Sequence, residues 1–187
     1  MEVRNEGFDG KAYQARFDAL AERGVDIHGE ARFVMSFEPS SVLDAGCGTG
    51  RVAIELARQG VEVVGVDADR SMIAEARARA PELSWVRSDL AHLDLGRRFD
   101  VVVLAGNVPL FCAEVDRPAL VRSCAAHVRA GGHMIAGFAL DGRYTLDEYD
   151  AECGSAGLAL AERFSTWDGR AFAPGGDYAV SVHRRQS

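Results

Sequence analysis

The stretch that decides the fold reads VLDAGCGTGR and runs from Val42 to Arg51. A short apolar run ends in an acid, and three glycines follow at alternate positions before a helical pattern begins. A strand, a glycine turn and a helix in this order bring the backbone of an α/β protein close to a nucleotide-like ligand. Glycine permits both the sharp turn and the close approach of backbone to ligand. The stretch therefore predicts a ligand-binding turn at Gly46, Gly48 and Gly50.

The spacing of these glycines narrows the class of ligand. The dinucleotide fingerprint is G-x-G-x-x-G, and its third glycine, counted from Gly46, would fall where this chain has Arg51. The form present is G-x-G-x-G, preceded by Asp44. It resembles motif I of the class I S-adenosylmethionine (SAM) dependent methyltransferases. The resemblance implies an enzyme that uses SAM as its cofactor.

Strand and helix patterns alternate beyond this turn. The predicted strands cover residues 41–44, 61–66, 83–87, 99–104, 133–138, 159–166 and 178–184, and the predicted helices cover 9–23, 29–37, 51–59, 70–80, 116–128 and 145–156. Near-continuous apolar strands between helices indicate a parallel sheet with helices on both faces. The last two strands have no helix between them, so we expect them to be antiparallel neighbours.

This order of elements resembles the class I methyltransferase fold. The resemblance implies an α/β protein with a doubly wound, seven-stranded, mostly parallel sheet, an antiparallel terminal strand, helices on both faces and a small N-terminal helical cap. A length of 187 residues suits one core. We expect residues 1–187 to form a single methyltransferase domain, with residues 1–40 as the cap and residues 41–187 as the SAM-binding core.

Composition restricts the partners. A net charge of −7 makes the chain a poor partner for nucleic acid or an anionic membrane, and no apolar run approaches the roughly 20 residues of a membrane helix. The four cysteines form no C-x-x-C pair, and the polar start MEVRNEGFDGK is unlike a signal peptide. We expect free thiols in a cytoplasmic protein, no metal, no nucleic-acid or membrane partner, a small-molecule substrate, and a monomer or homodimer.

Polar residues at strand ends are the candidate ligand contacts, because ligands of a doubly wound sheet lie outside the carboxyl ends of its strands. Asp67 ends the second strand in GVDAD. Its two oxygens suit a vicinal diol, and the resemblance implies that it binds the ribose of SAM. The alternative is a helix N-cap, which Asp69 or Ser71 would provide equally well.

The resemblance also implies the rest of the cofactor site. Asp89 would hold the adenine amino group, with the amide of Leu90 on a ring nitrogen, and Met72 would pack on adenine or in the core. Asp44 would reach the SAM ammonium or, alternatively, order the turn, and Cys47 would contribute its backbone. The predicted cofactor-binding residues are Asp44, Gly46, Cys47, Gly48, Gly50, Asp67, Ala68, Met72, Asp89, Leu90, Ala105, Gly106 and Asn107.

Catalytic residues are harder to predict. The fourth strand continues as AGNVPLF, a partial match to the N-P-P-Y motif of amine- and DNA-base-methylating relatives, without its first proline and with Phe111 as the aromatic residue. We expect Asn107 and Phe111 near the transferred methyl group. The catalytic candidates are Asn107 and two cap residues, Tyr13 and His28. Arg16, also in the cap, is a candidate for the SAM carboxylate or the substrate. In-line transfer of an activated methyl group needs no strong base, so a weak catalytic signature is compatible with an enzyme.

Two other functions stay open from sequence. An NAD(P)-dependent oxidoreductase fits Asp67 but neither Arg51 nor the antiparallel final pair. A SAM-binding regulatory or partner protein without transferase activity is not excluded by any residue. For the enzyme, we expect the substrate pocket between the cap, the segment Asn107 to Arg117 and the segment Gly137 to Tyr144.

Overall fold

A computed structural model describes residues 9–186 of the chain. Its strands are β1 (Ser41–Ala45), β2 (Glu62–Asp67), β3 (Ser84–Arg87), β4 (Phe99–Leu104), β5 (Val128–Ala139), β6 (Leu158–Phe164) and β7 (Tyr178–Arg185). Its α-helices are α1 (Gly10–Glu22), α2 (Gly29–Met35), α3 (Arg51–Arg58), α4 (Arg70–Arg79), α5 (Val108–Phe111), α6 (Arg117–Ala126) and α7 (Leu146–Ser155), with short 3-10 turns η1 (Leu90–His92) and η2 (Glu114–Asp116).

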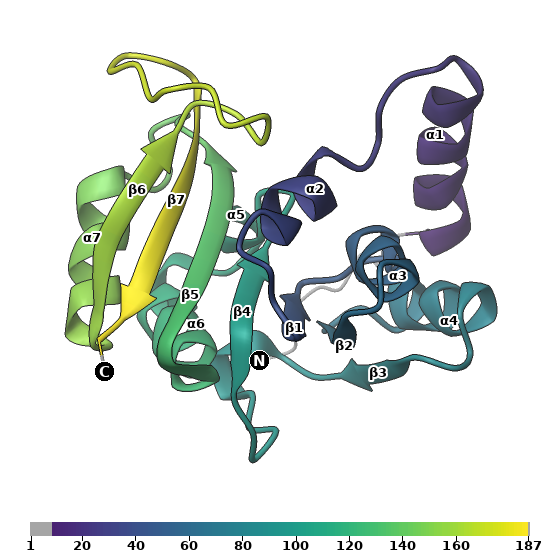
Figure 1. Cartoon of the computed structure of the whole chain (residues 1–187), viewed down its shortest axis with the longest axis horizontal. Helices are drawn as coiled ribbons and strands as arrows, with labels where there is room; N and C mark the ends of the chain where they lie inside the picture. The colour runs from purple at the N-terminus through teal and green to yellow at the C-terminus, as the bar shows by residue number, and fades with distance from the viewer. Residues whose placement is uncertain (1–8, 187) are drawn as a thin grey trace.

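The strands form a seven-stranded sheet in the order β3-β2-β1-β4-β5-β7-β6 (Figure 1). Strands β1 to β5 pair in parallel, and β7 is antiparallel to both β5 and β6. The predicted doubly wound sheet with its antiparallel terminal strand is therefore confirmed. Strand order reverses between β1 and β4, so the glycine turn after β1 and the segment after β4 face the same crevice.

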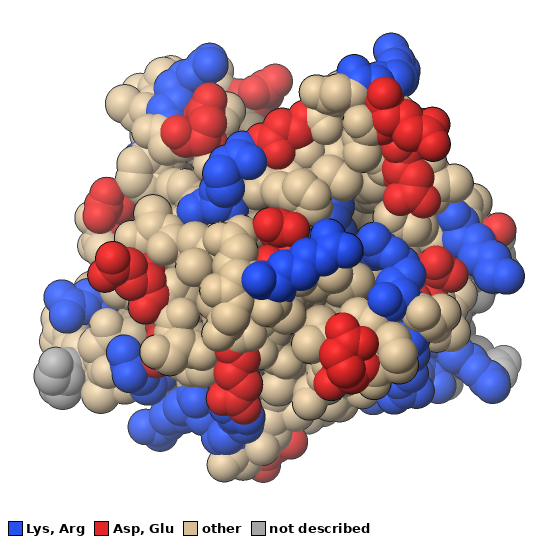
Figure 2. All heavy atoms as spheres, turned by 45° about the vertical axis from the view of Figure 1, so that its right-hand side comes forward, with Lys and Arg blue, Asp and Glu red and all other residues tan. Residues whose placement is uncertain are grey.

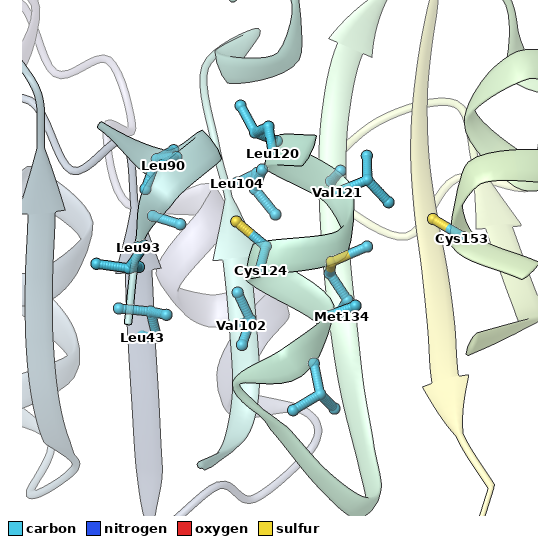
Figure 3. Close-up of a cluster of buried hydrophobic side chains, with 14 of the residues drawn as sticks. Leu43, Leu90, Leu93, Val102, Leu104, Leu120, Val121, Cys124, Met134 and Cys153 are labelled. Atoms are coloured by element: carbon cyan, nitrogen blue, oxygen red, sulfur yellow. The ribbon is translucent and has the colours of Figure 1, made fainter. Parts of the chain in front are cut away.

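Two apolar clusters, one on each face of the sheet, hold the helices. On one face, residues such as Val42, Val63 and Val101 pack against α2, α3 and α4. On the other, α6 and α7 cover the alternate strand residues, and Figure 3 shows Leu120 and Cys124 of α6 lying over β4. Strands buried on both faces explain why the sequence reads as continuous apolar runs rather than as an alternation.

Strand β5 is longer than predicted. Val128 pairs with Phe99, whereas His133 pairs with Val101, so the chain bulges between the two pairs. Gly131 lies in this bulge at φ +73°. Residues 129–132, which the prediction leaves between a helix (116–128) and a strand (133–138), are thus an irregularity inside one strand. In sequence this bulge looks like a turn, because both use a left-handed glycine conformation.

Helix α5 was not predicted. It begins directly after Asn107, a non-glycine residue at φ +66°, and a helix of four residues has no periodicity that a sequence pattern can reveal. The N–H of Asn107 donates to the carbonyl of Gly137 on β5 at 3.1 Å. This bond fixes the segment after β4 against the neighbouring strand.

Helices α1 and α2 form the N-terminal cap, whose residues 1–8 lie outside the described residues. In Figure 1, α1 stands beyond the sheet, next to α3 and α4, and an extended segment joins it to α2. Asp9 caps α1 by accepting from the N–H groups of Lys11 and Ala12. The N–H of Gly10 donates to Ser71 Oγ at 3.1 Å, which docks the start of α1 on α4.

Candidate functional site

A cavity of about 580 Å³ lies at the carboxyl ends of the strands, at the point where strand order reverses. Most of the predicted cofactor-binding residues line it together with residues of the cap and of α5. The lining consists of Tyr13, Arg16, Gly46, Gly48, Asp67, Ala68, Asp69, Met72, Asp89, Leu90, Ala105, Gly106, Asn107, Val108, Phe111, Cys112 and Leu120.

The carboxylate of Asp67 is fixed at the end of β2. Its Oδ2 accepts from the N–H of Gly48 at 2.8 Å, and its Oδ1 accepts from the N–H of Asp69 at 2.8 Å. Burial raises the pKa of Asp67, against the lowering effect of these two bonds. The geometry holds a two-oxygen acceptor rigidly at the wall of the cavity.

Asp69, not Asp67, is the N-cap of α4. Its Oδ1 accepts from the N–H groups of Ser71 at 2.7 Å and Met72 at 3.1 Å. Asp69 therefore performs the capping role that was the alternative for Asp67. The side chain of Asp67 lines the cavity instead.

Asp89 and Leu90 line the cavity at the start of η1. Asp89 Oδ1 accepts from the N–H of Ala91 at 2.9 Å, and Asp89 Oδ2 lies 3.6 Å from His92 Nδ1. The side chain of Asp89 is 63% exposed. It is therefore open to a ligand that enters from solvent.

Three of the predicted cofactor-binding residues, Asp44, Cys47 and Gly50, do not line the cavity. They lie in or next to the glycine turn and pack against the protein interior. Asp44 is buried, its Oδ2 accepts from the N–H of Ala53 at 3.1 Å, and burial raises its pKa to about 7. Burial likewise raises the pKa of the Cys47 thiol. A Cβ on Gly50 would come 2.4 Å from the ring of Trp85, so this glycine serves the close packing of α3 against the sheet. For Asp44, these contacts match the alternative in which the acid orders the turn.

The catalytic candidates divide between the cavity and the cap. Asn107 lines the cavity, and its Oδ1 accepts from the N–H of Ala139 at 2.8 Å, which leaves its side-chain NH₂ to face a ligand. Tyr13 also lines the cavity, and burial raises the pKa of its phenol. The structure does not bring His28 to the cavity. The turn between α1 and α2 aims its ring at α3, with Nδ1 3.9 Å from Glu55 Oε2.

Arg51 fastens the cap to the glycine turn, a role that the sequence did not indicate. Its guanidinium makes two bonds to Glu30, at 2.6 and 2.8 Å, and one to the carbonyl of Ile27. It also lies over the ring of Phe17, 4.7 Å from the centroid. The residue that replaces the third glycine of a dinucleotide motif thus contacts α1, α2 and the segment between them.

A second bond fixes α1 directly to the turn. Thr49 Oγ1 donates to Gln14 Oε1 at 2.6 Å, and both side chains are buried. Among the lining residues that sequence reasoning missed, Val108 and Cys112 lie inside the segment expected to form the substrate pocket. Leu120 lies on α6, and its apolar character could signal only core packing.

Charge is spread over the molecule without a dominant sign on the face that Figure 2 shows, where acidic and basic side chains are interspersed. In the part of the chain that the structure describes, no group of three or more His, Cys, Asp or Glu side chains could hold a metal ion. Nor does any helix among residues 9–186 have the length and apolarity needed to cross a membrane.

Comparison with known proteins identifies the family. A family model described as a methyltransferase domain matches residues 42–132. A TehB-like SAM-dependent methyltransferase from Corynebacterium glutamicum superposes with a TM-score of 0.89 at 33% identity, over 95% of this chain and 98% of that one. This chain belongs to the class I SAM-dependent methyltransferases. SAM is accordingly its cofactor, and the nicotinamide alternative finds no support.

Other similar methyltransferases cover less of the chain or share less sequence. Ubiquinone biosynthesis O-methyltransferases from Serratia proteamaculans and Alkalilimnicola ehrlichii are 30% and 32% identical over 64% and 65% of this chain, which spans 57% and 56% of their length. CalS10, an amino pentose methyltransferase from Micromonospora echinaspora, superposes with a TM-score of 0.74 at 21% identity. The superposition covers 98% of this chain and 100% of CalS10. The likeness to CalS10 shows the fold alone.

Proposed function

We propose that this methyltransferase transfers a methyl group from SAM to a small-molecule acceptor bound in the cavity at the switch point. The observation that carries the proposal is the carboxylate of Asp67, which is held at the cavity wall with both oxygens oriented by backbone N–H groups. Each carboxylate oxygen can accept a further hydrogen bond. A vicinal diol such as the ribose of SAM fits this acceptor pair.

The remaining contacts to SAM follow from the order of the lining residues. Gly46 and Gly48 would present backbone to the methionine part, and Ala105, Gly106 and Asn107 would flank it from the end of β4. Ala68 and Met72 would contact the adenosine part, and Asp89 and Leu90 at η1 would hold the adenine. Asp44, Cys47 and Gly50 would act from behind, by keeping the turn in shape.

Held by Asp67, Asp89 and the glycine turn, SAM would supply an activated methyl carbon. The acceptor's lone pair would bond to this carbon as the carbon–sulfur bond breaks toward sulfur, and the acceptor would lose a proton to solvent. The chain's own contribution is to hold the acceptor in line and to exclude water. Positioning of this kind can lower a barrier by roughly 7–11 kcal/mol. Asn107 orients this region, because its Oδ1 holds β5 and its NH₂ is left for the acceptor.

The acceptor would bind between the cap, the segment Asn107 to Arg117 and the segment Gly137 to Tyr144. Tyr13 and Arg16 supply the cap side of the cavity, and Val108, Phe111 and Cys112 supply the other. A concave cavity of about 580 Å³, shared with the cofactor, favours a small molecule over a macromolecule. The names of the curated relatives, which are enzymes of ubiquinone biosynthesis, agree with this size class.

The test is methyl transfer from isotope-labelled SAM to a panel of phenols, amines, carboxylates and thiols, with formation of S-adenosylhomocysteine (SAH) as a second readout. We expect a product from at least one class. Tight SAM binding without any product across the panel would contradict the proposal and favour the regulatory or partner-protein alternative.

We also propose a cytoplasmic protein that folds as one domain, residues 1–187, and works as a monomer or homodimer. The four cysteines lie apart as free thiols in the structure, which suits a reducing compartment. Bonds from α1 and α2 to the glycine turn support a cap that is part of the same domain. Cell fractionation, sedimentation and a single cooperative unfolding transition would support these proposals, and a membrane-bound fraction or separate unfolding of the cap would contradict them.

A further inference from the structure

A second cavity, of about 560 Å³, lies between α6 and the segment that joins β3 to β4. One wall is formed by residues 91–94 and 96–98. The other wall is formed by Ala119, Arg122, Ser123, Ala126 and His127. This cavity shares no lining residue with the proposed cofactor cavity, so methyl transfer gives it no role.

Hydrogen bonds from α6 and its C-cap hold the two walls together. Ser123 Oγ donates to the carbonyl of Leu93 at 2.7 Å. His127 Nε2 accepts from the N–H of Leu95 at 3.0 Å, while its Nδ1 lies 2.8 Å from the carbonyl oxygen of Ser123. On the inner side, Leu93 and Cys124 belong to the same apolar cluster, which Figure 3 shows. The fold itself therefore fixes the walls relative to each other.

Positive charge predominates in the lining of this cavity, which contains three arginines, Arg97, Arg98 and Arg122, and one carboxylate, that of Asp94. Arg97 is already paired with Glu62 at 2.7 Å. The guanidinium groups of Arg98 and Arg122 form no hydrogen bond or ion pair with any residue from 9 to 186. Two cations thus line a preformed cavity without a partner in the described chain, although the protein has a net charge of −7.

The charged groups around these two arginines do not neutralise them. Asp94 Oδ1 accepts from the N–H of Gly96 at 2.9 Å, which turns the carboxylate to its own loop. Arg185 donates to two backbone carbonyls instead of a carboxylate. Burial and, second, the positive charge of Arg98 lower the pKa of Arg185. The neighbour that Arg98 influences is therefore another cation.

From this arrangement we propose that the second cavity binds a small molecule with two or more phosphate or carboxylate groups, through Arg98 and Arg122. A guanidinium offers parallel N–H donors that match the oxygens of both groups. A concave site lined by charge of one sign also concentrates ligands of the opposite sign. The inference goes beyond the proposed function and does not depend on it, because the two cavities share no residue.

Calorimetric titration of pyrophosphate and of citrate at constant ionic strength tests the inference, with amide and arginine side-chain NMR shifts to locate each probe. We expect at least one probe to bind and to shift the signals of residues 91–98 and of Arg122. Tighter binding of pyrophosphate would assign a phosphorylated ligand, whereas tighter binding of citrate would assign a polycarboxylate. The affinity should be the same with and without SAH, so a protein that fails to bind SAH would contradict the proposed function alone.

Three variants test the two arginines. We expect Arg98→Gln and Arg122→Gln each to lower the affinity for the bound probe about ten-fold, because each loses a charge-assisted hydrogen bond. Arg58→Gln is the matched control, since Arg58 is an arginine of α3 whose side chain is 70% exposed. It should leave the affinity unchanged, and circular dichroism verifies that all three variants fold.

Four results would overturn the inference. They are no binding of either probe at millimolar concentration, shifts confined to the glycine turn at Gly46 and Gly48, and wild-type affinity in both Arg98→Gln and Arg122→Gln. The fourth is an equal loss in Arg58→Gln, which would show that the probes respond only to the overall charge of the protein.

Discussion

Asp67 and Asp69 lie two positions apart in GVDAD, and they have different roles in the structure. Asp69 caps α4, whereas Asp67 receives two backbone N–H groups and faces the cavity. Asp44 has a third environment, buried behind the turn with one bond to Ala53. The three carboxylates thus differ in their burial and in their hydrogen-bond partners. Neither property can be seen in the sequence.

Asp44 makes stability depend on pH. Burial raises its pKa from 3.8 to about 7, so between these values the folded protein keeps a proton that the unfolded chain releases. The free energy of unfolding is therefore highest below the unfolded pKa and falls as pH rises toward 7. Asp44→Asn keeps the acceptor for Ala53 and removes the charge.

We predict that Asp44→Asn gains stability relative to wild type as pH rises from 4 to above 7, by on the order of 4 kcal/mol. Urea unfolding of both proteins across this range measures the difference. A constant difference at all pH values would show that Asp44 ionises normally in the folded state.

At the scale of elements, the cap depends on Arg51. The Arg51 and Glu30 side chains are 12% and 18% exposed. Loss of the arginine would leave a largely buried carboxylate without its partner. We predict that Arg51→Met lowers the free energy of unfolding by about 2–4 kcal/mol and weakens SAM binding, because α1 and α2 lose their common attachment to the glycine turn.

Arg97→Met is the matched control for that substitution. Arg97 also pairs with a glutamate, Glu62, at 2.7 Å and lies over a phenylalanine ring, that of Phe99. Its pair is more open, however, at 40% and 62% exposure, so we expect a loss below about 1 kcal/mol and unchanged SAM affinity. Equal losses in the two variants, measured by urea unfolding, would contradict the role of Arg51.

The start of α3 depends on the contact between Gly50 and Trp85. Gly50 has φ +82°, and a Cβ there would come 2.4 Å from a ring whose Nε1–H donates to the carbonyl of Ala80 at 2.7 Å. Gly60 has φ +87° with open space around it. We predict a loss of about 1–2 kcal/mol for Gly60→Ala, from backbone strain alone, and a clearly larger loss for Gly50→Ala. Similar losses by thermal unfolding would mean that Trp85 does not restrict this position.

Over the whole molecule, periodicity predicted the sheet well. Every strand began within five residues of its predicted start, because buried parallel strands are short apolar runs separated by clear helix and glycine signals. The longest discrepancy is in β5, where Gly131 sits inside a bulge that resembles a turn in sequence. Helix α5 was missed because four residues contain no period.

The candidate site was predictable where it depends on strand ends. Asp67, Asp89 and Asn107 lie at or just beyond the ends of three different strands, and the switch-point rule alone brings them to one cavity. The site was not predictable where long-range contacts determine the position of a side chain, as for the pair of Arg51 and Glu30. Nor was it predictable where a loop directs a side chain away from the cavity, as for His28. Such contacts depend on the path of the chain between elements, which local pattern does not encode.

We propose that the cavity at the switch point binds SAM through the carboxylate of Asp67. Calorimetric titration of SAM into wild type, Asp67→Ala and the control Glu62→Gln, at the opposite end of β2, tests it most directly, with circular dichroism to verify folding. We expect binding to wild type and control, and an affinity about ten- to a hundred-fold lower in Asp67→Ala, because a charged acceptor is worth roughly 1.5–3 kcal/mol. Equal SAM affinity in wild type and a folded Asp67→Ala variant would contradict it.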